Sequence, residues 1–254
     1  MKKTFILIGS LISLFACRKA DYLDVNAGDR PPLTANIRFV NARTSAAGIQ
    51  FWTFTQQVTT TALTPGTTSA YLPTTYGNVQ INITEGNGSS YLVSRQFGNS
   101  ATYSATGGPN GPIPGYYHTV IAAPTRNDSS KDSLILFYDD LTAPPAGKAK
   151  IRLVHLASGI SAVAAQAIQS GSETKLSDSI PYGSASGSNI FGKAYDSAPF
   201  TQVNAGKITI RVTNKSTGTP ILISNLQDIE LAEGKIYTVF LLSNGKGIIS
   251  ANIL

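Results

Sequence analysis

Hydrophobic and polar residues alternate along much of the chain after residue 33. In Val79–Thr84 the odd-numbered positions are Val, Ile and Ile, and the even-numbered positions are Gln, Asn and Thr. Ile208–Thr213 follows the same pattern, with Ile, Ile and Val opposite Thr, Arg and Thr. Because successive side chains of a strand point to opposite faces, this alternation predicts half-buried antiparallel strands.

Two segments are apolar at nearly every position, namely Leu134–Tyr138 and Ile236–Leu242. Such runs predict strands that are central in a sheet or covered on both faces. Ser161–Gln169 has a composition that a helix would tolerate, but its position in the second half predicts the second strand there.

The first half of the chain predicts about seven short strands. They lie near residues 36–42, 49–54, 69–76, 78–84, 91–97, 116–122 and 133–139. This density of short strands is typical of a β-sandwich of immunoglobulin-like or transthyretin-like type. The expected fold is all-β, with two tandem antiparallel β-sandwich domains.

An internal repeat indicates that there are two domains. Three segments of the first half resemble segments of the second half in the same order, and the first pair shares an Ile-Arg-apolar-Val core, which indicates duplication. The pairs are Ala35–Ala42 with Ala149–Leu156, Gly77–Thr84 with Gly206–Thr213, and Tyr117–Val120 with Ile236–Val239.

Leu141–Gly147 contains two prolines and a glycine and has no strand pattern, which indicates a linker. The predicted domains are therefore residues 34–143 and residues 147–254.

The N-terminal segment has the features of an export signal. Lys2 and Lys3 precede an apolar run, Phe5–Phe15, that is too short to span a bilayer but has the length of a signal-peptide core. The run ends in Leu-Phe-Ala-Cys, which resembles a bacterial lipobox, and Cys17 is the only cysteine of the chain. We therefore expect residues 1–16 to be a lipoprotein signal peptide and Cys17 to carry the lipid.

Residues 17–33 are polar, contain two prolines and show no strand or helix period, so we expect a lipidated tether. Two or three acyl chains would anchor the protein stably in a membrane. The expected location is the cell envelope, lipid-anchored in the outer membrane, on its periplasmic or its exposed side.

Several motifs resemble a known family. Ile151–His155 reads Ile-Arg-Leu-Val-His and follows Asp-Asp-Leu, two prolines and Gly-Lys-Ala; Tyr237–Val239 reads Tyr-Thr-Val after Ala-Glu-Gly-Lys. These motifs resemble the domain of unknown function 4397 (DUF4397), whose members often carry tandem copies on secreted or lipid-anchored bacterial proteins. The resemblance covers most of residues 35–254 and is stronger in the second half. Since the family has no established activity, it implies fold and location only.

The chain departs from the family pattern after the first strand of each half. Family members commonly carry a Ser-Pro-Asp-Ala-Pro-like turn there, whereas this chain has Arg43–Gly48 and Ala157–Ser161. A function that depends on that turn is therefore in doubt.

Composition and charge narrow the function classes. Hydrophobic residues make up 42% of the chain, enough for a core, while charged residues make up only 13%. The formal net charge is +6, and removal of Lys2 and Lys3 leaves 18 basic and 14 acidic residues, or +4. The charges are dispersed without a basic stripe, so nucleic-acid binding is not expected.

The sequence offers no convincing catalytic or metal-binding set. His118 and His155 are the only histidines, lack metal-ligand spacing and are expected to be structural or surface residues. Asp139 and Asp140 are adjacent, so strand geometry sends them to opposite faces, and capping of the following turn is the favoured role. Gly183–Gly187 contains serines but no helix follows it, so no nucleophile is assigned. No enzyme activity and no cofactor are expected.

Two long loops are the better candidates for recognition, although flexibility without a ligand remains the simpler alternative. They are Gly98–Gly115 and Gly183–Pro199. Trp52 follows Phe51 on a predicted strand, so one of the two must face away from the other; Trp52 is expected to pack in the core. The tentative ligand-contact residues are Tyr103, Tyr116, Tyr117, Phe191 and Tyr195.

The leading hypothesis is a lipid-anchored envelope protein with a non-enzymatic binding or adhesion role, whose partner is a glycan or an envelope protein. One alternative is a glycan-binding accessory of a nutrient-uptake system, which the aromatic loops favour. A second is a structural spacer, and a third is an unrecognised hydrolase.

Overall fold

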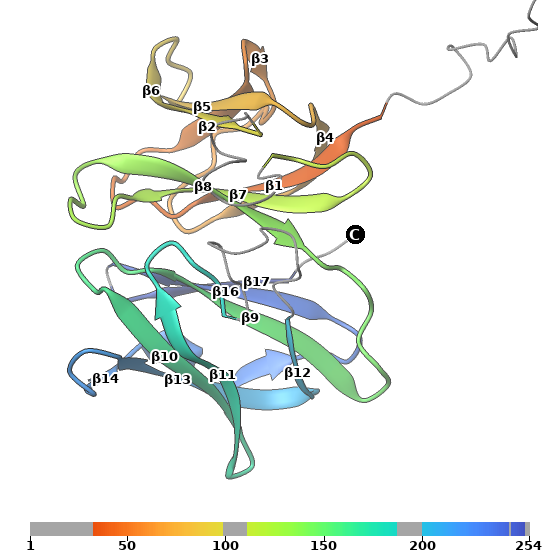
Figure 1. Cartoon of the computed structure of the whole chain (residues 1–254), viewed down its shortest axis with the longest axis vertical. Coiled ribbons are helices and arrows are strands. Elements are labelled where there is room, and N and C mark those ends of the chain that lie inside the picture. The colour runs from red at the N-terminus through yellow and green to blue at the C-terminus, as the bar shows by residue number, and fades with distance from the viewer. Residues whose placement is uncertain (1–32, 99–110, 187–199, 244, 252–254) are drawn as a thin grey trace, which may run out of the picture. The chain divides into compact units, whose positions relative to one another are not determined.

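Strands form nearly all of the regular structure in the computed structural model, which describes residues 33–98, 111–186, 200–243 and 245–251 (Figure 1). A single 3₁₀ turn, η3 (Ser224–Leu226), is the only helical element among these residues, and none of them forms a helix long and apolar enough to cross a membrane. The first-half strands are β1 (Ala35–Asn41), β2 (Ile49–Thr53), β3 (Gln56–Gln57), β4 (Thr68–Thr74), β5 (Val79–Glu85), β6 (Tyr91–Phe97), β7 (Tyr117–Pro124) and β8 (Asp132–Asp139). The later strands are β9 (Lys148–Leu156), β10 (Ala162–Gln169), β11 (Ser172–Pro181), β12 (Thr201–Asn204), β13 (Gly206–Asn214), β14 (Pro220–Ile221), β15 (Ile229–Leu231), β16 (Ile236–Leu242) and β17 (Gly247–Ala251).

All seven strands predicted for the first half are present, and the prediction for Ser161–Gln169 is confirmed by β10. Sequence reasoning missed β3, which has only two residues and pairs with β2 through a tight hairpin. The expected linker, Leu141–Gly147, lies between the end of β8 and the start of β9. Residues 1–32, including the predicted signal peptide and Cys17, lie outside the described residues.

Each half contains two sheets, and strand order corresponds between the halves. The first half has the orders β3-β2-β5-β6 and β4-β1-β7-β8; the second has β11-β10-β13-β14 and β12-β9-β16-β17, with β15 as an added partner of β13. The three pairs of repeated segments therefore fall on corresponding strands, namely β1 with β9, β5 with β13, and β7 with β16. The all-β, two-sandwich expectation is confirmed, with one unexpected feature: β1–β7 and β9–β16 are parallel pairs.

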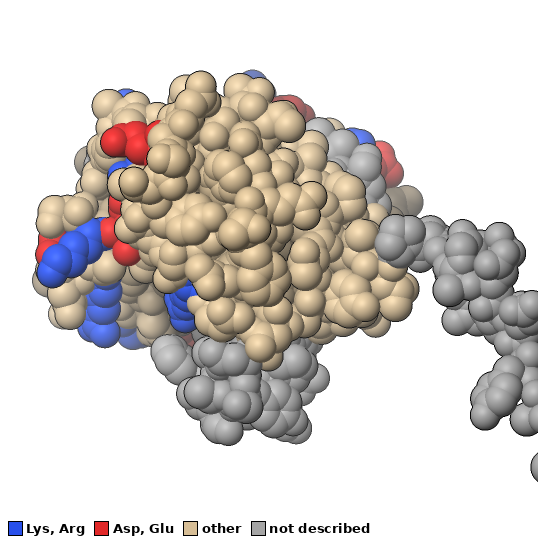
Figure 2. Space-filling view, turned by 90° about the horizontal axis from the view of Figure 1, so that it is seen from above, with Lys and Arg blue, Asp and Glu red and all other residues tan. Residues whose placement is uncertain are grey.

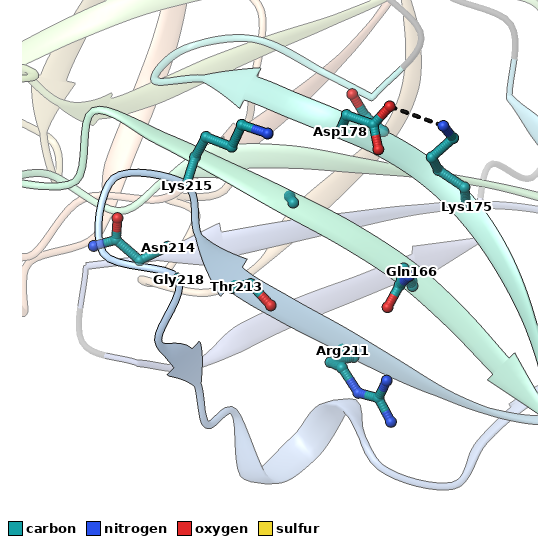
Figure 3. A pocket seen from close by; sticks show the side chains of 10 residues that line it. Gln166, Lys175, Asp178, Arg211, Thr213, Asn214, Lys215 and Gly218 are labelled. Carbon is teal, nitrogen blue, oxygen red and sulfur yellow. Dashed lines mark hydrogen bonds and ion pairs between the residues drawn. The ribbon is translucent and has the colours of Figure 1, made fainter.

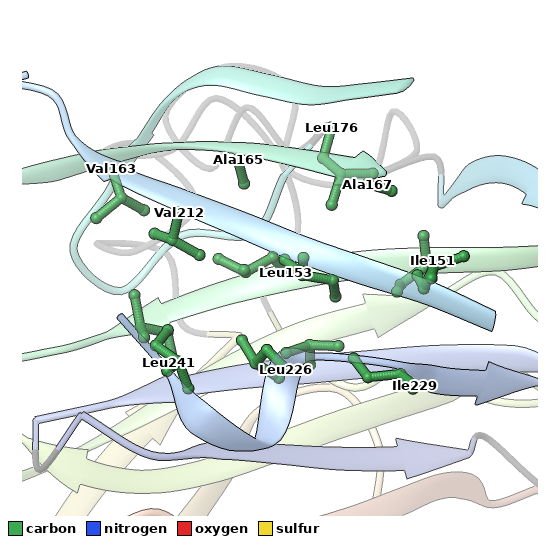
Figure 4. Packing of buried hydrophobic residues seen from close by; sticks show 14 of the residues in the cluster. Ile151, Leu153, Val163, Ala165, Ala167, Leu176, Val212, Leu226, Ile229 and Leu241 are labelled. Atoms are coloured by element: carbon green, nitrogen blue, oxygen red, sulfur yellow. The ribbon is translucent and has the colours of Figure 1, made fainter. Parts of the chain in front are cut away.

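Each sandwich has its own core between its two sheets. The first core brings together Phe39 of β1, Phe51 of β2 and the alternating Val79, Ile81 and Ile83 of β5. Phe39 and Phe51 contact each other with ring centroids 4.6 Å apart. Figure 4 shows the second core, where side chains including Leu153, Val163, Val212, Leu226 and Leu241 meet between the sheets.

A third apolar cluster joins the two sandwiches. It takes Val40, Ile121 and Phe137 from the first half and Val154 and Phe240 from the second, among others. The β4-β1-β7-β8 and β12-β9-β16-β17 sheets thus face each other across a shared junction (Figure 1).

The junction explains the continuous apolar runs. Ile236–Leu242 forms β16, which is central in its sheet and buried on both faces. Leu134–Tyr138 lies on β8, which is an edge strand, yet one face packs in the first core and the other in the junction. Burial on two faces, not central position, therefore accounts for the pattern in β8.

Candidate functional site

The junction contains a buried charge network built from the two repeated arginines. Arg38 of β1 and Arg152 of β9 occupy the same position of the Ile-Arg-apolar-Val repeat, and both are almost completely buried. Each donates to a threonine of the neighbouring parallel strand in its own half. Arg38 Nη2 lies 3.1 Å from Thr119 Oγ1, and Arg152 Nε lies 3.1 Å from Thr238 Oγ1. These two arginine–threonine contacts thus correspond to each other in the two halves.

Both arginines also bridge the halves. Arg38 Nη1 donates to Ser250 Oγ at 3.1 Å, on β17 of the second half. Arg152 Nη1 donates to the carbonyl oxygen of Tyr138 at 2.9 Å, and Arg152 Nη2 pairs with the carboxylate of Asp139. The junction is therefore held by directional bonds in addition to apolar packing.

Asp139 is the single anion of this network. Its Oδ2 accepts hydrogen bonds from Thr119 Oγ1 at 2.6 Å and from Tyr71 Oη at 2.8 Å. Burial alone would raise the pKa of Asp139, but attraction to Arg152 and Arg38 and these hydrogen bonds hold it below the ordinary value. The carboxylate therefore remains charged and holds the sandwiches together, which differs from the turn-capping role expected from sequence.

Asp140 does cap the turn. Its Oδ1 accepts a hydrogen bond from the backbone N–H of Thr142 at 3.0 Å, and its Oδ2 lies 3.5 Å from Lys150 Nζ. Asp139 is the last residue of β8 and Asp140 follows it, and the two carboxylates contact different residues of β9, Arg152 and Lys150.

The two histidines are structural. His118 and His155 are completely buried. Nε2 of His118 accepts a hydrogen bond from the backbone N–H of Ile113 at 2.9 Å, and Nε2 of His155 lies 3.0 Å from the carbonyl oxygen of Ile160. Burial lowers the pKa of each to about 4, so both rings are neutral near pH 7. Among the described residues, no group of three or more His, Cys, Asp or Glu side chains is placed to bind a metal ion.

The serines of Gly183–Gly187 have a backbone role where the structure describes them. Ser186 Oγ accepts a hydrogen bond from the N–H of Leu153 at 2.9 Å, and its own N–H donates to the Leu153 carbonyl at 2.7 Å. Ser186 thereby pairs with both backbone hydrogen-bonding groups of Leu153 on β9.

Two of the five predicted ligand-contact residues can be placed. Tyr116 is 49% exposed and packs against Tyr138, with ring centroids 5.6 Å apart. Tyr117 is half-buried and lies edge-on to Tyr71, with centroids 5.1 Å apart. They are neighbours at the start of β7 and contact different partners, so they do not form one surface. Tyr103, Phe191 and Tyr195 lie outside the described residues.

A surface that the sequence did not single out lies on the outer face of the β3-β2-β5-β6 sheet. Strand register places nine side chains on the side of the sheet away from the core: two aromatic rings, five amides and two hydroxyls. Gln50, Asn82 and Thr84 among them are buried, and the other six are partly or fully exposed. We call this set the amide–aromatic face. Its members are Gln50, Trp52, Gln57, Gln80, Asn82, Thr84, Tyr91, Ser94 and Gln96.

The amide–aromatic face carries no charged side chain at an outward position of its four strands, all of whose residues are described. The two charged residues of these strands belong to the inward register. Arg95 pairs with Ile81 and reaches the Leu134 carbonyl of β8, and Glu85 pairs with Ile49 at the strand end. Figure 2 looks down on this side of the protein, and most of the surface it shows is free of Lys, Arg, Asp and Glu.

Trp52 belongs to this face and not to the core, so the expectation of core packing was wrong. Phe51 is buried in the first core, while Trp52 is partly exposed on the opposite side of β2. The Trp52 indole donates Nε1–H to Thr84 Oγ1 at 3.1 Å and lies edge-on to Tyr91, with centroids 6.3 Å apart. The neighbouring Gln50 signals this in the sequence, because a polar residue shares the parity of Trp52.

Phe54 extends the aromatic set at the β2–β3 hairpin. Its side chain is 44% exposed, and its backbone φ of 52° lies in the left-handed region that a phenylalanine rarely adopts. Three hydrogen bonds hold it: its N–H donates to the Gln80 carbonyl at 2.8 Å, and its carbonyl accepts from Asn82 Nδ2 at 2.7 Å and from Tyr91 Oη at 3.0 Å. Side chains of the face thus fix an unfavourable turn that exposes an aromatic ring.

The outer sheet of the second half has a different character. A shallow groove of about 290 Å³ lies over β10, β11 and β13 (Figure 3). Lys175, Arg211 and Lys215 line it together with Asp178. Lys175 Nζ pairs with Asp178 Oδ2 at 2.8 Å, and Arg211 Nη1 pairs with Glu173 Oε1 at 2.6 Å. Both ion pairs are exposed, and the lining carries three cations against one carboxylate, so the groove is basic but open to solvent.

The fold and surfaces describe a two-sandwich protein with a fused junction and two chemically distinct outer faces. Residues 35–166 match the family model of a domain of unknown function, DUF4397. These 132 residues are just over half of the 254-residue chain, and the chain belongs to this family. The match includes all of the first half and ends within β10, whereas the sequence motifs suggested a stronger resemblance in the second half.

Comparison with solved structures finds a similarity to the fimbrial anchor protein Mfa2 from Porphyromonas gingivalis. The identity is 11%, the match covers 85% of this chain and 96% of that chain, and the TM-score is 0.18. A similarity of this size carries no argument about function. No curated protein matches the chain.

Proposed function

We propose that this protein is a lipid-anchored, non-enzymatic component of the cell envelope that binds a partner through the outer faces of its two sandwiches. The observation that carries the proposal is the junction. It buries one sheet of each sandwich together with a charged Arg38–Asp139–Arg152 network, so that the remaining outer sheet faces are displayed on one body. A tether after Cys17 would hold that body away from the membrane.

The amide–aromatic face favours recognition over a purely passive spacer. Aromatic rings and side-chain amides are the groups that orient ligands at protein surfaces, and here they are arranged on a rigid sheet. A purely structural spacer would not require an exposed Phe54 at a strained backbone φ.

The first experiment is protease accessibility on intact cells that express the native chain or the Cys17→Ser variant. Membrane fractionation of the same cells tests the anchor. We expect the native chain to fractionate with membranes and the variant to lose that association, because the thiol is the site of lipid attachment. Cleavage of the native chain while a periplasmic marker survives would place it on the exposed side. Protection until the outer membrane is opened would place it in the periplasm. Equal membrane association of both forms would overturn the anchoring.

Glycan binding for nutrient uptake is the second candidate, and the uncharged amide–aromatic face is the observation that favours it. A cell lacking this protein would then grow more slowly on a polysaccharide but not on its monosaccharide. Identical growth on both would count against the uptake role.

A further inference from the structure

The amide–aromatic face and Phe54 combine three features that together point to one class of ligand. We propose that the outer face of the β3-β2-β5-β6 sheet binds an uncharged oligosaccharide, with Phe54, Tyr91 and Trp52 as stacking platforms. This inference rests on the proposed binding role and names its ligand class and site.

The first feature is the clustering of exposed aromatic rings. Of the seven large hydrophobic side chains that are exposed among the described residues, Phe54, Tyr91 and Leu92 lie at this sheet. Tyr91 links the set, because its ring contacts Trp52 and its hydroxyl donates to the Phe54 carbonyl. The C–H groups on a sugar-ring face carry partial positive charge, and they fit against the negative face of an aromatic ring.

The second feature is the field of neutral polar groups around the rings. Gln80 Nε2 donates to Asn82 Oδ1 at 2.8 Å, and Gln50 Nε2 donates to Asn87 Oδ1 at 3.3 Å. Asn82 and Gln50 are themselves buried, and these bonds orient Gln80, which is partly exposed, and Asn87, which is exposed. The remaining donors and acceptors of Gln80 and Asn87 are left for a ligand. A sugar presents hydroxyls that both donate and accept, which is the property that amides match and that carboxylates or ammonium groups do not.

The third feature is the absence of charge at the outward positions of these strands. A charged ligand that settled here would lose hydration without gaining a counter-charge, which is unfavourable. The groove over β10, β11 and β13, which contains Lys175, Arg211 and Lys215, is the surface that an anionic ligand would prefer. Electrostatics therefore assigns neutral ligands to the first sandwich.

Phe54 supplies the strongest sign that the face is built for binding. A glycine or asparagine would relieve the positive φ, and either would remove an exposed apolar ring. The chain instead keeps phenylalanine and clamps it with Asn82 and Tyr91, two members of the face. Because these bonds fix the Phe54 backbone, less freedom is lost when a ligand stacks on its ring.

The test uses the soluble protein comprising residues 18–254, because all described strands lie within residues 33–254, which form one compact unit. Trp52 is the only tryptophan of the chain, so its fluorescence reports this face alone. The protein is titrated with gluco-, xylo-, manno- and chito-oligosaccharides and, for comparison, with acidic oligogalacturonate and hyaluronan fragments. We expect a saturable change in Trp52 emission with at least one neutral series and none with the acidic fragments.

The decisive variant is Phe54→Asn. Asparagine tolerates the turn conformation, so the thermal midpoint should be unchanged or higher, while calorimetric affinity for the neutral oligosaccharide should fall about tenfold or more. Tyr91→Ala should lower affinity similarly. Tyr116→Ala is the matched control, because it removes an exposed tyrosine elsewhere and should leave affinity unchanged.

Three outcomes would overturn the assignment: no neutral series binds, only the acidic fragments bind, or affinity falls with Tyr116→Ala but not with Phe54→Asn. A Phe54→Asn variant that abolishes concentration-dependent self-association would instead identify the face as a contact between two copies, and the glycan assignment would be wrong. Membrane fractionation of Cys17→Ser is independent of these titrations, so failure of the glycan site leaves the anchoring proposal standing or falling by its own result.

Discussion

At the scale of single residues, the two junction arginines depend on one carboxylate to compensate their buried charge. Asp139 accepts from Arg152, Thr119 and Tyr71, and it is the one anion among these buried groups. Two guanidinium groups that are buried beside a single carboxylate cannot both be compensated if it is lost.

We therefore expect Asp139→Asn to lower the free energy of unfolding by about 3–5 kcal/mol. Guanidinium-induced unfolding measures the change. Asp140→Asn is the matched control: its carboxylate is partly exposed and meets Lys150 at 3.5 Å, so its loss should cost well under about 1 kcal/mol. Similar losses for both variants would contradict the distinction between the junction aspartate and the capping aspartate.

The buried histidines predict a pH dependence of stability. Burial lowers the pKa of His118 and of His155 to about 4, whereas an unfolded histidine titrates near 6.5. Between these values the unfolded chain binds more protons, so stability is complete above about pH 6.5 and falls as the pH decreases toward 4, by at most about 1.4 kcal/mol per pH unit for each histidine.

Urea unfolding at several pH values between 7.5 and 4.5 checks this dependence. The carboxylates with lowered pKa, including Asp139, titrate below this window and do not produce the effect. A double variant, His118→Gln with His155→Gln, should be less stable at pH 7 but should show a flatter profile. An unchanged slope in the double variant would assign the dependence to other groups.

At the scale of elements, glycines close the base of the long loop that begins at Gly98. A Cβ on Gly111 would lie 2.3 Å from the Gly77 carbonyl oxygen and 2.8 Å from the Gly98 Cα. A Cβ on Gly98 would likewise lie 2.3 Å from the same carbonyl. The two ends of this loop are therefore joined where three backbone segments meet with no space for a side chain.

Gly111→Ala should lower stability by about 2 kcal/mol, because the clash is with backbone that cannot move freely. Gly66→Ala is the comparison: that glycine has a φ of 83° but open space around it, so only the conformational strain of about 1 kcal/mol is expected. Thermal unfolding of both variants ranks them. A smaller loss at Gly111 than at Gly66 would show that the loop base tolerates displacement.

The strands themselves were largely readable from the sequence, because the alternation that predicts a strand is also what buries one of its faces. β5 is the clearest example, with Val79, Ile81 and Ile83 in the core. Adjacent aromatic residues were harder. The pattern predicts that Phe51 and Trp52 point to opposite faces of their strand. Which of the two faces the core depends on the register of β2 with β5, and the polar Gln50 is the only sequence signal for it.

The functional surfaces were less readable, since they depend on which strands become neighbours. The arginine of the repeat was visible in both halves, yet its burial depends on the junction between two sheets, which no local pattern reveals. The available sequence signal for this burial was a charged residue within a strand that is otherwise apolar on both faces. The amide–aromatic face likewise joins Trp52 with Tyr91, which are 39 positions apart in sequence.

At the scale of the whole molecule, the shared junction should make two sandwiches unfold as one. Each has its own core, but the junction cluster and the Asp139–Arg152 pair bury side chains from both. If either sandwich unfolded alone, the other would expose that apolar surface and retain uncompensated charges.

The single tryptophan makes this testable, because Trp52 lies in the first half while far-ultraviolet circular dichroism reports strands of both. Leu153→Ala removes a buried side chain from the second core (Figure 4) and should cost about 2–5 kcal/mol. We expect the Trp52 fluorescence midpoint to fall by the same amount as the circular dichroism midpoint, although the substitution is in the other half. The contrary outcome is a Trp52 transition that stays at its original midpoint while the circular dichroism signal splits into two steps. That result would show that the two domains unfold independently. The junction would then be too weak an interface to hold the two sandwiches as one body.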